Sequence, residues 1–362
     1  MSLDKNIYYP IVILPFHGPL VEEFKKQNIA YKILKLPVFR RELFNLKGIL
    51  QYSYRSVVCF FQLTYLVLAD KISIIHTNTS AVIIGGFVSC LTKRKHIWQI
   101  MEIIEKPYLL RCALAKIVGI LSSEVFCISD AVRNYFITYN PEKRKSKFKT
   151  LYHGVDPHVY HFSQAYRHTI RQQLGVNEEC TVVGFIGRFN AWKGQDIFMD
   201  AAKKCMAQQQ DVQLHFLIIG SCFQGQDKYR IALEHALSEE STLKENVSLY
   251  GFQENIHEWL SAIDILILPS KLPEPNATIV LAAMATAVPV IGTNIGGTLE
   301  TIIDKETGLL IPPHNSDSLC ENILYLAKNK DLRVAMGKKG LDRVQNIFSL
   351  KNYNETIQKA YE

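Results

Sequence analysis

Long apolar runs are missing from the sequence. No stretch reaches the roughly 18 to 20 apolar residues that a membrane-spanning helix needs. The most apolar run, residues 57–69, is shorter and contains Gln62, which favours a buried helix. Residues 1–6 are polar and include Asp4 and Lys5, so they do not have the pattern of a signal peptide. We therefore expect a cytoplasmic protein without a transmembrane segment.

Closely spaced cysteine pairs are also absent. The sequence has eight cysteines, none of them in a CxxC pair, and most lie in apolar segments. This pattern predicts buried, reduced thiols in a cytosolic protein rather than zinc ligands or disulfides. Because no other cluster has the spacing of metal ligands, we expect neither a metal nor a cofactor.

Acidic residues are scarce in the first part of the chain. Residues 1–160 contain 22 Lys and Arg against 11 Asp and Glu, whereas residues 161–362 contain 19 against 23. Basic clusters occur at 93–95 and 143–147. They indicate either a solvated surface or contact with an anionic membrane face or a lipid diphosphate. Nucleic acid is disfavoured, because aromatic residues do not alternate with these clusters.

Strand patterns and helix patterns alternate along the whole chain, and its length favours two domains. Such alternation predicts an α/β fold with two doubly wound, Rossmann-like parallel sheets and a ligand cleft between them. We place the first domain at residues 1–160, joined by a C-terminal helix at 345–362, and the second at 161–344. The expected strands are 7–15, 30–36, 72–78, 96–101, 124–128, 148–152, 181–186, 214–219, 247–250, 263–268, 288–292 and 308–311.

The segment from Gly184 to Gly194 is central to the functional prediction. A β-branched apolar run precedes it and a helical pattern follows it, so Arg188 and Lys193 lie in a strand-to-helix turn. That turn is at the carboxyl edge of a parallel sheet, where open α/β sheets bind ligands. A guanidinium and an ammonium beside glycines suit a diphosphate, although two solvated surface cations are the alternative.

Short motifs follow this segment in a fixed order. They are Leu268-Pro269-Ser270, Pro273-Glu274-Pro275, Ala283-Met284-Ala285, Val288 to Asn294, Gly296 to Glu300 and Thr307 to Leu310. With these motifs, the second half resembles the retaining glycosyltransferases of family 4 (glycosyl transferases group 1), which have the two-domain GT-B architecture. The first half matches more loosely, through Gly18-Pro19-Leu20, Ser129 and His153-Gly154-Val155-Asp156.

The resemblance implies metal-independent transfer of a sugar, with retention, from a nucleotide-diphosphate donor to an acceptor hydroxyl. A UDP-sugar is favoured over a GDP-sugar, and the acceptor is a saccharide or is linked to a lipid. Arg188 and Lys193 would stabilise the leaving diphosphate, and Glu274 would accept hydrogen bonds from the sugar. The alternative for Glu274 is a carboxylate that only favours a helix start. The implied substrate-binding residues are Gly187, Gly251, Phe252, Ile256, Asn276, Ala277 and Thr278, the last at the start of a helix.

Several positions depart from the family pattern. Ala282 stands where the family has a second Glu that holds the ribose, so donor affinity should fall by on the order of tenfold to a hundredfold. Asn276 and Ala277 replace an aromatic residue and a glycine, which retunes the choice of sugar. No His ends the strand at 96–101. Glu102 follows that strand, either as a carboxylate for the reaction or as a solvated charge. His76 also ends a strand, with a satisfied core histidine as the alternative, and His153, before a glycine turn, suits a structural role.

The amino end departs most. The first strand-loop-helix unit of related chains is missing here, so we expect an exposed sheet edge in the first domain. A homodimer, a partner chain or a membrane would cover it. Together with Ala282, this leaves a second reading open: a glycosyltransferase-like subunit of little activity that serves as a binding or scaffolding partner. A sugar-diphosphate epimerase of similar two-sheet form matches the motifs poorly.

Overall fold

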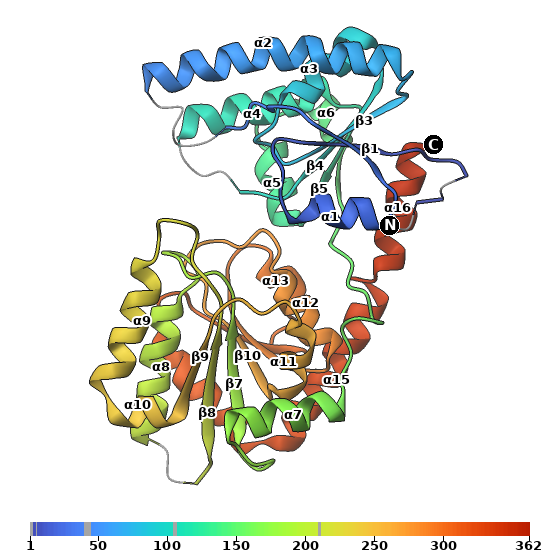
Figure 1. Ribbon diagram of the computed structural model, residues 1–362. Helices are drawn as coiled ribbons and strands as arrows, with labels where there is room; N and C mark the ends of the chain where they lie inside the picture. Colours follow the sequence, from blue (N-terminus) through green and yellow to red (C-terminus); the bar gives the residue numbers. More distant parts are fainter. Residues whose placement is uncertain (1–2, 5, 40–44, 104–106, 209–210) are drawn as a thin grey trace. The chain divides into compact units, whose positions relative to one another are not determined.

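The computed structural model describes residues 3–4, 6–39, 45–103, 107–208 and 211–362. These residues form two compact units (Figure 1). The first unit spans Met1–Leu151 and Asn354–Glu362, and the second spans Tyr152–Tyr353. Residues 152–160 and 345–353, which we expected in the first domain, therefore pack with the second unit. Helix α16 (Leu350–Tyr361) begins in the second unit and ends in the first.

The second unit is built on a parallel sheet in the order β12-β11-β10-β7-β8-β9. β7 has the sequence TVVGFI and is buried on both faces, as expected of a central parallel strand rich in β-branched residues. The expected doubly wound sheet is confirmed, with most strand ends within two residues of their predicted positions. The strands are β7 (Thr181–Ile186), β8 (Leu214–Ile219), β9 (Val247–Tyr250), β10 (Ile265–Leu268), β11 (Val290–Thr293) and β12 (Gly308–Ile311).

Helices cover both faces of this sheet (Figure 1). One apolar core lies mainly under α8, α9 and α14, and the other lies mainly under α7, α11, α12 and the end of α15. The helices are α7 (Gln164–Leu174), α8 (Gln195–Gln208), α9 (Lys228–Glu239), α10 (Ser241–Asn246), α11 (Ile256–Ala262), α12 (Thr278–Ala285), α13 (Thr298–Thr301), α14 (Ser316–Lys328) and α15 (Lys330–Asn346).

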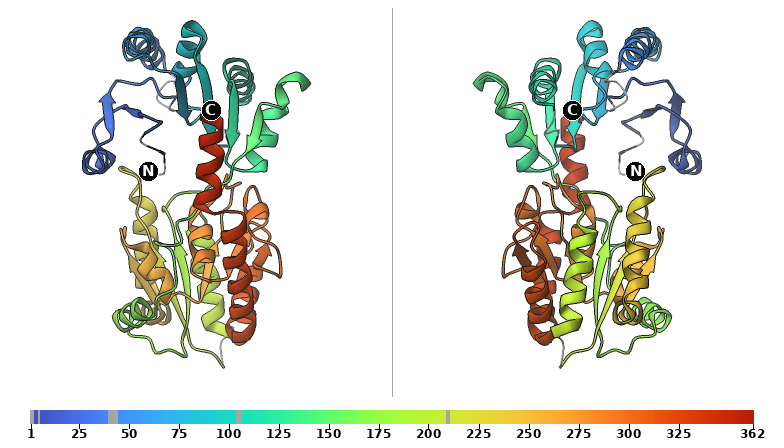
Figure 2. Two further views of the ribbon diagram at one scale, coloured as in Figure 1. Left: turned by 90° about the vertical axis from the view of Figure 1, so that its right-hand side faces the viewer. Right: turned by 90° about the vertical axis from the view of Figure 1, so that its left-hand side faces the viewer.

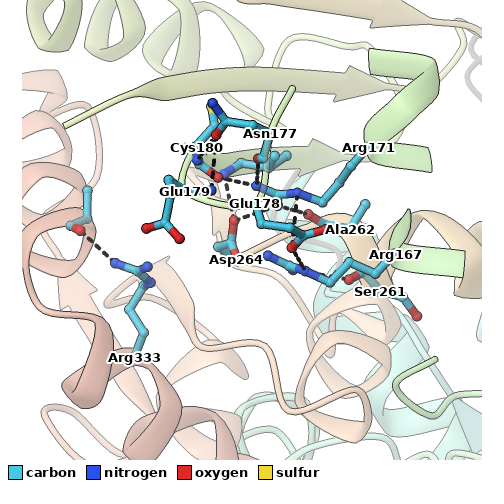
Figure 3. Close-up of polar contacts among 12 residues, drawn as sticks. Arg167, Arg171, Asn177, Glu178, Glu179, Cys180, Ser261, Ala262, Asp264 and Arg333 are labelled. Carbon is cyan, nitrogen blue, oxygen red and sulfur yellow. Dashed lines mark hydrogen bonds and ion pairs between the residues drawn. The ribbon is translucent and has the colours of Figure 1, made fainter. Parts of the chain in front are cut away.

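A buried arginine fastens α7 to the sheet of the second unit (Figure 3). Arg171 is 1% exposed, and its Nη1 lies 3.1 Å from the Asp264 carboxylate just before β10. The guanidinium also donates to the backbone carbonyls of Ala262, Asn177 and Cys180. Asp264 in turn accepts a hydrogen bond from the first residues of β7, at the amide of Val182. The pair therefore fixes the amino-terminal ends of β7 and β10.

The first unit contains two separate parallel sheets, β1-β2 and β3-β4-β5-β6 (Figure 2). Its core lies where β4 and β5 pack against α4 and α5. The predicted strand at 7–15 is shorter than expected. The strands are β1 (Ile11–Leu14), β2 (Ala30–Ile33), β3 (Ile74–Asn78), β4 (Lys95–Ile100), β5 (Glu124–Cys127) and β6 (Phe148–Thr150). The helices are α1 (Pro19–Lys26), α2 (Leu46–Ala69), α3 (Ile84–Thr92), α4 (Tyr108–Leu121), α5 (Asp130–Ile137) and α6 (Glu142–Lys145).

Helix α2 corrects one prediction. The run at 57–69 was expected to be a buried helix, but only Cys59, Leu66 and Val67 of α2 are buried. Its other large apolar side chains are mostly exposed. Within the described parts of the chain, no helix is both long enough and apolar enough to span a bilayer.

Candidate functional site

Two loops at the carboxyl edge of the second unit's sheet are tied together. After β7, the Asn190 side chain accepts hydrogen bonds from the amides of Trp192 and Lys193, both at 3.0 Å. The Trp192 carbonyl then accepts from the amide of Lys271 in the loop after β10. Gly194 has φ +73°, and a Cβ there would lie 1.9 Å from the Pro269 carbonyl oxygen. Only glycine allows this approach, so the turn position of Lys193 is fixed by its neighbours.

Lys193 and Glu274 meet across these loops. Lys193 Nζ lies 2.7 Å from Glu274 Oε1, and the two side chains are only 20% and 9% exposed. Ser270 Oγ donates to the same oxygen at 2.8 Å, and the Ser270 carbonyl accepts from Thr293. In the part of the chain that the structure describes, Glu274 Oε2 has no hydrogen-bond donor. Glu274 is thus paired and oriented through Oε1, while Oε2 remains able to accept a hydrogen bond from a hydroxyl group.

Glycines bring a third loop against the backbone of Glu274. The Gly297 amide donates to the Glu274 carbonyl at 2.7 Å, and Glu274 forms a parallel bridge with Gly296. Gly296 has φ +60°, and a Cβ there would lie 2.6 Å from the Glu274 carbonyl oxygen. The Gly296-Gly297 pair that follows β11 is therefore needed for this close packing.

Arg188 has a different environment from Lys193. Its guanidinium carbon lies 3.6 Å above the ring of Phe223, which belongs to the loop after β8. Arg188 is exposed, and no carboxylate among the described residues pairs with it. Stacking on an aromatic ring holds the guanidinium plane while leaving its N–H donors available to an anion.

The positions expected to contact the nucleotide lie at the carboxyl ends of β7 and β9. Gly187 donates its amide to the Ile219 carbonyl, and a Cβ at Gly187 would meet only the Phe185 ring, at 3.8 Å. Gly251 lines a small cavity of about 50 Å³ together with Gly220. Phe252 is 71% exposed, and Ile256 opens α11.

The side chain of Asn276, between Glu274 and α12, lacks a hydrogen-bond partner among the residues that the structure describes. Both its amide nitrogen and its carbonyl oxygen are shielded from solvent, yet neither finds a partner among the described residues. Thr278 is the first residue of α12, and the Ala277 side chain does not cap the helix amides. Buried amides are normally satisfied, so an unsatisfied one beside a loop of this kind favours a ligand contact. Ala282 is buried in the core under α12.

In the first unit, the Glu102 carboxylate is fixed by hydrogen bonds from Ser80 and is not freely solvated. Its Oε2 accepts from the Ser80 amide at 3.1 Å and from the Ser80 hydroxyl at 3.2 Å. Burial lowers the pKa of His76 to about 4, with a further contribution from nearby His96. His76 Nδ1 lies 2.6 Å from the Tyr361 hydroxyl, which favours the alternative of a core histidine. Burial also lowers the pKa of His153.

The sequence prediction missed three contributors to the site: Asn190, which shapes the Lys193 turn, Ser270, which holds Glu274, and Phe223, which carries Arg188. Ser270 was inside a quoted motif, and its place directly after a strand was the available signal. Phe223 gave no signal, since only the fold brings its loop beside Arg188. Among residues whose placement is described, no group of three or more His, Cys, Asp and Glu side chains is arranged to hold a metal.

Comparison with known proteins bears on this site. Residues 167–343 match the family model described as "Glycosyl transferases group 1". The uncharacterized glycosyltransferase MJ1178 of Methanocaldococcus jannaschii is 25% identical over 99% of this chain and 97% of its own length. The capsular polysaccharide biosynthesis glycosyltransferase CapM of Staphylococcus aureus is 23% identical over 81% of this chain and 77% of CapM. For other curated relatives, the chain spans between 42% and 65% of their length.

The fold has solved counterparts. The crystal structure of Anabaena Alr3699/HepE in complex with UDP superposes with a TM-score of 0.83 and 22% identity, covering 97% of this chain and 91% of that one. HepE has also been solved with UDP-glucose. The expected GT-B class, with two Rossmann-like parallel-sheet units, is thereby confirmed.

Proposed function

We propose that this chain, whose residues 167–343 match the family model described as "Glycosyl transferases group 1", moves a sugar from a nucleotide-diphosphate donor to an acceptor hydroxyl. The observation that carries the proposal is the Lys193–Glu274–Ser270 cluster, with its buried carboxylate, at the carboxyl edge of the second unit's sheet. A UDP-sugar is the favoured donor, and the complexes of the similarly folded HepE with UDP and UDP-glucose support that choice. Neither a metal nor a cofactor is required in this proposal.

The proposed reaction retains the anomeric configuration. The bond between the sugar's anomeric carbon and the diphosphate oxygen breaks, and the acceptor oxygen bonds to the same face of that carbon. The acceptor's proton passes to the departing diphosphate. Negative charge grows on the diphosphate as the bond breaks, and the fixed cations Arg188 and Lys193 stabilise it more in the transition state than in the bound donor. Glu274 would position the sugar through its second oxygen.

The acceptor in this proposal is a saccharide or a saccharide linked to a lipid. The likeness to CapM supports a role in polysaccharide or glycoconjugate synthesis. Glu102, held by Ser80, is the proposed carboxylate of the first unit for this reaction. A cytoplasmic location and the cover of the first unit's sheet edges by a second copy or partner chain stay predictions.

Calorimetry with UDP, GDP and ADP tests the proposal, followed by a screen of UDP-sugars and GDP-sugars with mass-spectrometric readout. We expect UDP to bind and one sugar donor to be consumed. Ala282 offers no carboxylate to the ribose. The affinity for UDP should therefore be on the order of tenfold to a hundredfold lower than at a site whose carboxylate accepts a hydrogen bond from the ribose.

The second candidate is a glycosyltransferase-like binding or scaffolding subunit. Ala282 and the split sheet of the first unit favour it. The same calorimetry separates the two candidates, since a scaffold of this kind would bind none of the three nucleotides. Binding without any donor turnover would also favour the scaffold.

A further inference from the structure

Helix α2 of the first unit carries an exposed apolar stripe. Tyr54, Phe61 and Tyr65 are 70%, 66% and 75% exposed. The exposed apolar side chains recur every three or four residues along the helix, which places them on one face. The members of this α2 stripe are Leu46, Ile49, Leu50, Tyr54, Val57, Val58, Phe61, Tyr65 and Leu68.

The stripe is a surface of the folded unit. α2 packs against α3 (Figure 1), and its buried residues are Cys59, Leu66 and Val67, on the side of the helix away from the stripe. α3 also exposes Phe87 and Leu91. Scattered exposed apolar residues are ordinary, but a contiguous row over the length of a helix usually marks an interaction surface.

A cationic cavity lies at the beginning of the same helix. It has a volume of about 400 Å³ and is formed by the first half of α2, by residues 15–16 after β1 and by residues 35–38 after β2. Lys35, Lys47 and Arg55 line it, and the lining contains no Asp or Glu among the residues that the structure describes. Within the described ranges, none of these three cations has a carboxylate partner. Unpaired cations around a concave surface suit an anion with several oxygens, such as a phosphate.

The charges of α2 decide between the possible occupants. The helix has no acidic residue, and its only charges are Lys47 and Arg55. The α2 helix of a second copy would offer no carboxylate to pair with these cations, which disfavours a second copy of this chain. An anionic bilayer offers both an acyl boundary for the stripe and phosphates for the cations.

We propose that the α2 stripe and the adjoining cavity dock on the surface of an anionic phospholipid bilayer. α2 lies in the plane of the interface, with its exposed apolar side chains at the headgroup–acyl boundary. A lipid phosphate occupies the cavity beside Lys35, Lys47 and Arg55. This docking does not depend on glycosyl transfer, but it would place the acceptor side of the proposed enzyme where lipid-linked acceptors are found.

Co-sedimentation with vesicles tests the docking. The full chain should bind vesicles of phosphatidylcholine mixed with phosphatidylglycerol and should bind pure phosphatidylcholine weakly. Phe61→Glu with Tyr65→Glu should reduce the binding by at least about tenfold, because two exposed apolar side chains leave the interface. Ile231→Glu, an equally exposed apolar position on α9, should bind as the wild type does. Unchanged thermal unfolding shows that the variants are folded.

The cavity has its own test. Lys47→Ala with Arg55→Ala should weaken binding to the anionic vesicles by about fivefold for each cation removed. Lys338→Ala with Lys339→Ala, on α15, removes the same charge and should have little effect. The proposal is overturned if the wild type does not bind anionic vesicles. It is equally overturned if the α2 double variant (Lys47→Ala with Arg55→Ala) and the α15 double variant (Lys338→Ala with Lys339→Ala) lose the same amount of binding. It is also overturned if the chain dimerises in solution and Phe61→Glu with Tyr65→Glu makes it monomeric. None of these results bears on nucleotide binding.

Discussion

At the scale of single residues, Lys193 has two tasks in the proposed site. Its ammonium neutralises Glu274 in the free protein, and in the proposed reaction it also stabilises the departing diphosphate. A carboxylate that is only 9% exposed is costly without a cation, and the Lys193 ammonium offsets that cost.

Lys193→Ala should lower turnover by at least about tenfold with folding intact, because one charged contact to the leaving group is lost. Lys271→Ala is the matched control, since Lys271 is also 20% exposed, lies on the facing loop, and pairs with Asp196 instead. Turnover with the best donor is the measurement. Near-normal turnover of the Lys193 variant would remove this residue from the mechanism.

Asn276 gives a second prediction. Asn276→Ala removes two buried polar atoms that have no internal partner, so the melting temperature should stay the same or rise. If the side chain contacts the sugar, the affinity for the UDP-sugar should fall by about tenfold while UDP binds as before. Calorimetry with both ligands measures this difference. A lower melting temperature, or an equal loss for UDP and UDP-sugar, would contradict a sugar contact.

At the scale of secondary-structure elements, the Arg171–Asp264 pair connects α7 with the beginnings of β7 and β10. Asp264→Asn should destabilise the second unit by about 3–5 kcal/mol, because it removes the nearer and more buried of the two carboxylates that pair with the buried Arg171 guanidinium. Glu178→Gln is the control: Glu178 pairs with Arg167 at 2.9 Å and with Arg171 at 3.7 Å but is 50% exposed, so its loss should cost at most about 1 kcal/mol. Urea unfolding of the full chain compares them. Equal effects would show that burial does not decide the strength of the pair.

Local patterns were sufficient for many of these elements. The predicted bounds of β7, β8, β9 and β12 agree with the structure, and α12 begins at Thr278 as expected. Each is a short apolar run bounded by turn residues, so the local sequence is enough to predict where the element begins and ends. α2 was different: its sequence is apolar nearly all round, and only the fold decides which face is covered. The contacts of Arg188 with Phe223 and of Arg171 with Asp264 also depend on loops that are distant in sequence.

At the scale of the whole molecule, the two units should respond differently to acid and to ligand. Burial lowers the pKa of His76 and of His96, both in the first unit, to about 4. His96 contacts Thr77 and the Leu121 carbonyl. In the unfolded chain a histidine has a pKa of about 6.5. Below that pH the unfolded state binds protons that the folded unit does not bind, which favours unfolding. Stability from these groups is complete above about pH 6.5 and is lost as the pH falls towards 4.

The expected loss at pH 5 is on the order of 2 kcal/mol for each of the two histidines, since each pH unit contributes about 1.4 kcal/mol. Burial lowers the pKa of His153 and His215 in the second unit as well, so that unit also weakens, but we expect the first to weaken more. UDP, bound by the second unit in our proposal, should raise only that unit's unfolding temperature. Calorimetric scans at pH 7 and pH 5, with and without UDP, should therefore show the UDP-insensitive transition falling further in acid. Replacing His76 and His96 by Gln should flatten that fall, and a UDP-sensitive transition that drops more steeply would contradict the assignment.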